Sequence, residues 1–85
     1  MKEKAEIREF LRHLLANYGD NEPFGDSDGL LSVGRLQSID AVEIVMFLEK
    51  NFDVDFAQVG FDRDRLESVN AIYGIVQNAL NRTEG

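Results

Sequence analysis

The spacing of apolar residues along the chain predicts α-helices, and no alternating pattern typical of a strand competes with it. Between residues 3 and 18, apolar side chains recur every three or four positions, while charged side chains occupy the opposite face. This apolar face consists of Ile7, Leu11, Leu14, Leu15 and Tyr18. Gly19 follows directly, and a glycine often ends a helix. We therefore predict a first helix over residues 3–18.

A second helix is predicted over residues 38–51. Ser38 suits its N-cap, because a serine hydroxyl can accept a hydrogen bond from a free backbone N–H of the first turn. Asp40 and Glu43 lie in the first turns, where the helix dipole favours negative charge. Residues 52–56 then leave the helical pattern.

A last helix is predicted over residues 69 to about 80, with Ser68 as its cap. Residues 60–66 can hold one short helical turn before this helix begins. The ends of the chain, residues 1–2 and 81–85, are expected to be frayed.

The connection over residues 19–37 is rich in glycine and acidic residues. Its apolar side chains should pin it to the core, namely Leu30, Leu31, Val33 and Leu36. Loops of this length are uncommon in small domains and are often functional. The whole pattern predicts one all-α domain over residues 1–85, with three long helices, one short helix and this long loop between the first two.

Composition narrows the classes of function. The chain has no cysteine and one histidine, which excludes disulfides and zinc sites of the usual kind. The net charge of −7 argues against nucleic-acid binding and favours basic partners, although it also suits a domain that is simply well solvated. The N-terminal residues show no secretory signal, and no uncharged run is long enough to span a bilayer. We therefore expect a cytoplasmic monomer that does not insert into membranes.

The acidic loop matches a calcium-binding pattern only in part. When an EF-hand loop is aligned from Asp20, Leu31 falls at position twelve, where a bidentate glutamate is required. An alignment from Asp26 also fails, so we expect no metal site. A nucleophilic serine needs a base within reach, and the only histidine, His13, lies among charged residues of the first helix. We therefore do not expect an enzyme.

Residues 38–52 carry two separate apolar faces on a helical wheel. The face expected to pack in the core consists of Ala41, Ile44, Val45, Leu48 and Phe52. The second, here called the apolar stripe, consists of Ile39, Val42 and Met46. Glu43 and Glu49 flank this stripe, and Asp40 lies further round. The stripe is either a docking surface for a partner with an apolar groove and a basic rim, or a face that the long loop covers, and the pattern favours the two interpretations equally.

Ser38 begins this helix, and its simplest role is that of an N-cap. A serine that another enzyme modifies needs exposure, a mobile neighbourhood and a recognition surface beside it. Ser38 has the glycine-rich loop before it and the apolar stripe after it. A helix N-terminus also suits an attached phosphate, because free N–H groups and the helix dipole favour negative charge.

The segment from Gln37 to Glu49 resembles the signature of the acyl carrier protein family. That signature reads Asp-Ser-Leu, followed by an acidic amphipathic helix that contains Val-Glu-Leu-Val-Met. Here the sequence reads Gln-Ser-Ile-Asp-Ala-Val-Glu-Ile-Val-Met-Phe-Leu-Glu. Phe52-Asp53 and Ser68-Val69 also stand where the family would place them, so the resemblance extends from the first helix to about residue 80.

The resemblance implies an acyl-carrier-like four-helix bundle and a 4′-phosphopantetheine on Ser38, which would hold an acyl or aminoacyl group as a thioester. It implies partner-binding positions that are apolar at Ile39, Val42 and Met46, acidic at Asp40, Glu43 and Glu49, and next to the modified serine at Gln37. The implied partners are a phosphopantetheinyl transferase, an acyl- or aminoacyl-loading ligase, and acyl-transferring enzymes with basic docking surfaces. This resemblance favours the docking interpretation of the apolar stripe.

The chain departs from the family pattern at two single positions. Gln37 stands where the family has aspartate, which removes one acidic handle for the transferase. Lys50 stands where a typical carrier of fatty-acid biosynthesis has a further carboxylate. The segment 61–66 is longer than in housekeeping carriers and resembles D-alanyl or aminoacyl carriers, which indicates a specialised carrier. The alternative function is an unmodified acidic adaptor that keeps the carrier fold.

Overall fold

The computed structural model describes the backbone of residues 2–60 and 62–84, and the side chains of the same residues except 58–59 and 82–84. Within these ranges the chain is all-helical and contains no strand, which confirms the predicted all-α class. The three long helices are α1 (Lys2–Ala16), α2 (Ser38–Phe52) and α4 (Val69–Glu84). Between α2 and α4 lie the single-turn helix α3 (Phe56–Val59) and the 3₁₀ helix η1 (Arg63–Arg65).

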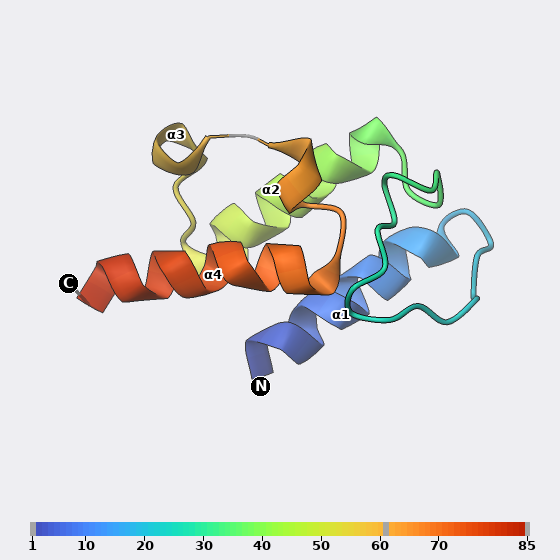
Figure 1. Cartoon of the computed structure of the whole chain (residues 1–85), viewed down its shortest axis with the longest axis horizontal. Helices are drawn as coiled ribbons and strands as arrows, with labels where there is room; N and C mark the ends of the chain where they lie inside the picture. Colours follow the sequence, from blue (N-terminus) through green and yellow to red (C-terminus); the bar gives the residue numbers. More distant parts are fainter. Residues whose placement is uncertain (1, 61, 85) are drawn as a thin grey trace.

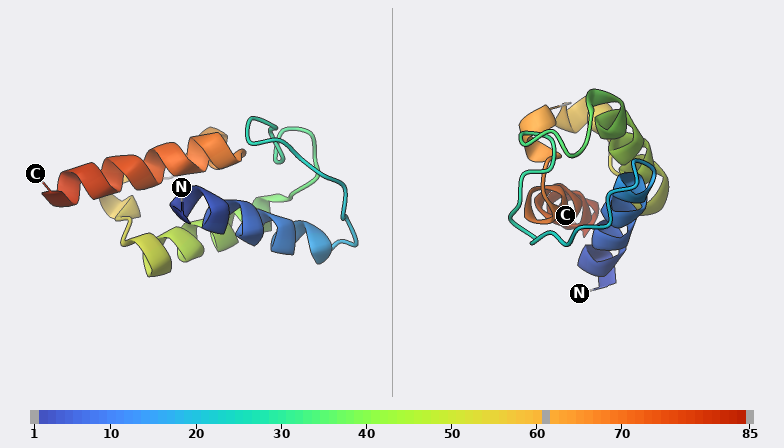
Figure 2. Two further views of the ribbon diagram at one scale, coloured as in Figure 1. Left: turned by 90° about the horizontal axis from the view of Figure 1, so that it is seen from below. Right: turned by 90° about the vertical axis from the view of Figure 1, so that its right-hand side faces the viewer.

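The three long helices enclose one apolar core (Figure 1). Seen from below, α1 lies in front, with α4 on one side of it and α2 on the other (Figure 2, left). Each helix contributes side chains that are almost inaccessible to solvent, which are Ile7 and Leu11 from α1, Ile44 and Leu48 from α2, and Ile72 and Val76 from α4. The loop between α1 and α2 covers one end of this core (Figure 1).

The predicted core face of α2 is confirmed. Ala41, Ile44 and Leu48 are at most 1% exposed. Val45 and Phe52 are half-buried and pack against the same core. On α2, Phe47 also stacks on Phe10 of α1, with 4.1 Å between the ring centroids, so aromatic contact joins the two helices at the margin of the core.

The loop from residue 17 to residue 37 is held to the core by three leucines. Leu30, Leu31 and Leu36 are buried, as predicted. The backbone carbonyl of Leu30 accepts the N–H groups of both Arg35 and Leu36, which closes the segment that leads into α2. Val33 is 68% exposed, so the prediction that it would help to pin the loop is wrong.

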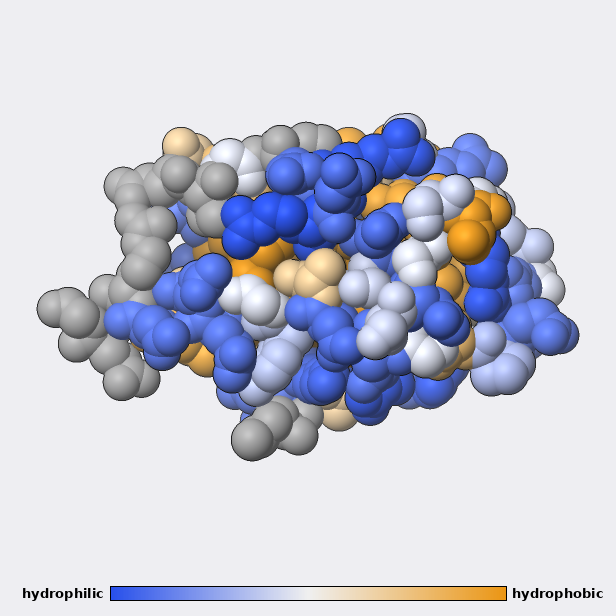
Figure 3. Space-filling view, in the orientation of Figure 1, coloured by the Kyte–Doolittle hydropathy of each residue, from blue (hydrophilic) through white to orange (hydrophobic). Residues whose placement is uncertain are grey.

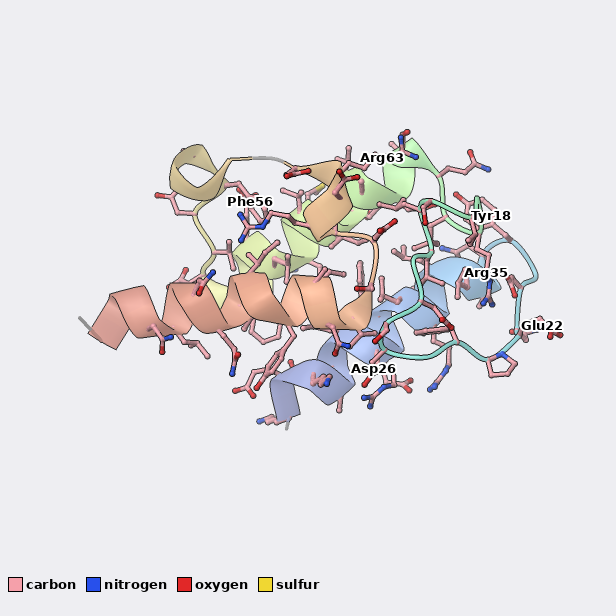
Figure 4. All side chains as sticks on the ribbon, viewed as in Figure 1. Tyr18, Glu22, Asp26, Arg35, Phe56 and Arg63 are labelled. Carbon is pink, nitrogen blue, oxygen red and sulfur yellow. The ribbon has the colours of Figure 1, made fainter. Side chains whose placement is uncertain are left out.

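Two arginines bind the acidic residues of this loop. Arg35 makes two hydrogen bonds of 2.9 Å to the carboxylate of Asp20, and it also donates to the backbone carbonyl of Glu22. Arg8 of α1 makes two hydrogen bonds to the carboxylate of Asp26, at 3.0 and 2.8 Å. The two carboxylates on which the calcium alignments began are therefore engaged in ion pairs that hold the loop in place (Figure 4).

The limits of several elements differ from the predictions. Helix α1 ends at Ala16, two residues before the predicted end, and α4 continues to Glu84, four residues beyond the predicted end near residue 80. Of the ends that were expected to be frayed, residues 1 and 85 lie outside the described part. Helix α3 was not predicted, and it begins because the Asp55 carboxylate accepts the N–H of Ala57 at 3.0 Å.

The short turn expected over residues 60–66 is present as η1. The predicted cap of α4 is also confirmed, because the Ser68 hydroxyl accepts the backbone N–H of Ala71 at 3.1 Å.

Candidate functional site

The N-terminus of α2 is the candidate site, and its N-cap is Gln37 rather than Ser38. Gln37 has an extended backbone, with φ of −107° and ψ of 172°, and Ser38 is the first residue of the helix proper. The prediction that Ser38 caps the helix is therefore wrong by one position. As a consequence, the Ser38 hydroxyl is not used for capping, and among the described residues no hydrogen bond engages it.

Asp40 takes over the capping function. It is 5% exposed, and its Oδ2 atom accepts the backbone N–H of Gln37 at 2.8 Å and the hydroxyl of Tyr18 at 2.6 Å. The hydrogen bond to this carboxylate raises the pKa of the Tyr18 hydroxyl above its usual value. Asp40 was predicted to be an acidic docking residue, and in the structure its side chain is buried, with Oδ2 bound by two donors, so little of it is open to solvent.

The apolar stripe is open to solvent. Ile39, Val42 and Met46 are 61%, 46% and 57% exposed, which confirms that they lie away from the core. The long loop therefore does not cover them, and that interpretation of the stripe is wrong. Large apolar side chains that are exposed together on one helix face typically mark an interaction surface.

The acidic rim of the stripe consists of Glu43 and Glu49, and both are exposed. Gln37 and Ser38 are exposed as well, so an uncharged polar corner adjoins the stripe at the start of α2. For contrast, the face on which α4 and the loop lie toward the viewer is mainly hydrophilic where it is coloured (Figure 3). The candidate site thus combines one accessible hydroxyl, three apolar side chains and two carboxylates on a single helix.

Tyr18 belongs to this site, although the sequence did not indicate it as a site residue. It was assigned to the apolar face of the first helix, but it lies in the turn after α1 and is 45% exposed. Figure 4 shows it at the end of the molecule where α2 begins. Its partner, Asp40, is 22 residues away in the sequence, and no local pattern could have indicated this contact.

Among the described residues, no hydrogen bond joins the Ser38 hydroxyl to another side chain. The single histidine, His13, is exposed on α1. Across the part of the chain that the structure describes, no three metal-binding side chains gather, and none of the described helices combines the length and apolar character needed to cross a membrane.

Comparison of the chain with known protein families, with curated proteins and with solved structures finds no match.

Proposed function

We propose that the protein is a carrier that holds an acyl or aminoacyl group as a thioester on a 4′-phosphopantetheine attached to Ser38. One observation carries this proposal. Ser38 is exposed, its hydroxyl is not used as the helix cap, and it lies directly beside the exposed apolar stripe. The resemblance of residues 37–49 to the acyl carrier signature supplies the identity of the group. In this proposal the helices form an acyl-carrier-like four-helix bundle, in which the short turn η1 takes the place of the short fourth helix.

Ser38 fits this attachment chemically. Its Oγ atom would attack the phosphorus of coenzyme A that bears the pantetheine, forming an Oγ–P bond while the P–O bond to adenosine 3′,5′-bisphosphate breaks. The hydroxyl proton would pass to a base of the transferase, because His13 is the only histidine of the chain and lies on a different helix. The resulting phosphodiester carries negative charge at the N-terminus of a 15-residue helix, where free N–H groups and the dipole stabilise it.

The apolar stripe and its acidic rim are the proposed docking surface for the partners. Ile39, Val42 and Met46 would enter an apolar groove, while Glu43 and Glu49 would meet basic side chains around it. The net charge of −7 adds steering toward such partners. The partners in this proposal are a phosphopantetheinyl transferase, an acyl- or aminoacyl-loading ligase, and enzymes that take the acyl group.

Intact-mass measurement after incubation with a phosphopantetheinyl transferase and coenzyme A tests this function. We expect the wild-type chain to gain the mass of one phosphopantetheine, and the Ser38→Ala variant to gain none. Because Ser38 is an exposed first helical residue and not the cap, the substitution should change the free energy of unfolding by less than about 0.5 kcal/mol. A wild-type chain that stays at its original mass with several transferases would contradict the proposal.

The same experiment separates the carrier from an unmodified acidic adaptor with the carrier fold. Two observations favour this second function: Gln37 replaces the family's aspartate, and the carboxylate of Asp40 is buried. Both leave less negative charge exposed beside Ser38 for a basic transferase to recognise. An adaptor would use the exposed stripe for docking and would leave Ser38 unmodified.

A further inference from the structure

Tyr18 connects the end of α1 to the first turn of α2 through its hydroxyl. The hydroxyl donates to the Oδ2 atom of Asp40 at 2.6 Å, and the same oxygen accepts the backbone N–H of Gln37 at 2.8 Å. Tyr18 lies in the turn after α1, and the next residue, Gly19, has a φ of 74° that suits glycine. Three segments therefore meet at one carboxylate oxygen: this turn, the N-cap and the first turn of α2.

The carboxylate of Asp40 depends on these two donors. Asp40 is 5% exposed, and a buried carboxylate that loses a hydrogen-bond donor is driven to turn toward water. If Asp40 turned away, the N–H of Gln37 would lose its acceptor, and the start of α2 would no longer be fixed at Ser38. The position of Ser38 therefore depends on a hydroxyl that does not touch it.

We propose that Tyr18 is a positioning residue for the modification of Ser38, and that it acts through Asp40. This inference rests on the proposed function and deepens it. A docked transferase would hold α2 by the apolar stripe, so the Ser38 Oγ atom reaches the phosphorus of coenzyme A only if the first turn keeps its geometry relative to the stripe. Small displacements of a reacting atom cost large factors in rate, because the attack requires close approach and alignment.

Steady-state kinetics of the transfer reaction with the Tyr18→Phe variant test the inference. The substitution keeps the ring and removes only the hydroxyl that donates to Asp40. We expect kcat to fall on the order of tenfold, because the loss concerns the alignment of Ser38. The KM for the carrier should stay within about twofold of the wild-type value, since the stripe, Glu43 and Glu49 are unchanged.

Two control variants separate positioning from a general loss of stability. Tyr73→Phe removes a tyrosine hydroxyl of α4 that accepts a hydrogen bond from Gln77 and has no contact with Asp40. Ile75→Val shortens a side chain of the core that is 3% exposed, which lowers the melting temperature without altering the start of α2. We expect kcat to stay unchanged in both variants, measured at a temperature where all variants are folded.

The route through Asp40 is tested by combining substitutions. If Tyr18 acts through Asp40, then adding Tyr18→Phe to Asp40→Asn should lower kcat little beyond the effect of Asp40→Asn alone. Fully additive effects would overturn this route.

The other possible outcomes distinguish failure of the Tyr18 inference from failure of the proposed function. A modified wild-type chain together with an unchanged kcat for Tyr18→Phe would overturn the inference alone. A rise in KM without a fall in kcat would also overturn it, because Tyr18 would then contribute to docking. If Ile75→Val lowered kcat as much as Tyr18→Phe does, the effect of Tyr18→Phe would be explained by lost stability alone, and the positioning role of Tyr18 would be overturned. A wild-type chain that no transferase modifies would overturn the proposed function, and the inference with it.

Discussion

At the scale of single residues, one ion pair, Arg35–Asp20, joins two parts of the acidic loop, and another, Arg8–Asp26, holds the loop to α1. Hydrogen bonds from the Arg35 guanidinium lower the pKa of the Asp20 carboxyl, and those from Arg8 lower the pKa of the Asp26 carboxyl, which Lys4 also faces at 3.5 Å. The side chains of these acids and of Arg35 are less than a third exposed, so solvent screens the pairs only in part. Loop conformation is thereby coupled to the charge of two carboxylates.

The ion pairs predict a loss of stability in acid. Because the pKa values of Asp20 and Asp26 are lowered in the folded state, their contribution is fully present above the unfolded pKa of about 4 and declines as pH falls through the lowered folded values. We expect the melting temperature to fall below about pH 5, and to fall less steeply over this range in Asp26→Asn. Thermal melts from pH 3 to pH 7 check this, and equal slopes for both proteins would contradict it.

Gln37 is the residue at which a single charge should alter the rate of modification. An aspartate at this exposed position would add negative charge next to Ser38, and added charge at the rim of an interface acts mainly on the association rate. We expect Gln37→Asp to be modified faster than the wild-type chain by a transferase with a basic docking surface.

The salt dependence provides the control for Gln37→Asp. Screening should shrink the gain as ionic strength rises from low salt to about 0.15 M. Equal transfer rates for both forms at low salt would show that Gln37 has no effect on recognition.

At the scale of elements, α2 differs from a simple amphipathic helix because it is apolar on two sides. Leu48 on one side is fully buried, whereas Met46 on the other is 57% exposed. One apolar side is sufficient to pack a helix in a small bundle, so the second side has no structural need. This surplus of exposed apolar surface is the main reason to regard α2 as the docking element.

Truncations on the two sides of α2 should therefore have different effects on stability. We expect Leu48→Ala to cost about 2–5 kcal/mol in the free energy of unfolding, because it leaves a cavity in the core. Met46→Ala should cost less than about 1 kcal/mol, since the side chain is already mostly in water. Denaturant titrations of both variants provide the measurement, and a loss for Met46→Ala as large as for Leu48→Ala would place the stripe in the core.

The same elements show how far apolar periodicity predicts a fold. The buried faces of α1 and α2 follow from a spacing of three and four residues, because the sequence itself carries that period. The limits of helices depend on single contacts, and these were less predictable. The start of helix α3 is fixed by one side-chain cap, the Asp55 carboxylate. The N-cap of α2 is Gln37 instead of Ser38, because the Asp40 carboxylate accepts the Gln37 N–H.

At the scale of the whole molecule, the candidate site depends on contacts between distant segments. Ser38 and the stripe could be identified from the sequence, since their pattern lies within one helix. The burial of Asp40 could not be predicted, because it requires Tyr18, which reaches it from another element after the chain has folded. The exposed position of Val33 likewise depends on how the loop crosses the end of the core.

The overall charge of the molecule complements this arrangement. The net charge is −7 on 85 residues, and under the proposed function this charge favours partners with a basic surface. In the proposed carrier, the negative charge attracts the partner, the apolar stripe binds it, and the acyl group is held on the phosphopantetheine of Ser38.

The site of attachment is the most direct test of this account. Peptide mass spectrometry, after modification of the wild-type chain by a phosphopantetheinyl transferase with coenzyme A, should place a single phosphopantetheine on Ser38. The chain offers matched alternatives, because Ser27 and Ser32 lie in the acidic loop, and Ser68 caps a helix. Attachment at Ser38 alone is the result that we predict, and attachment at any of the other three serines, or at none, would contradict the account.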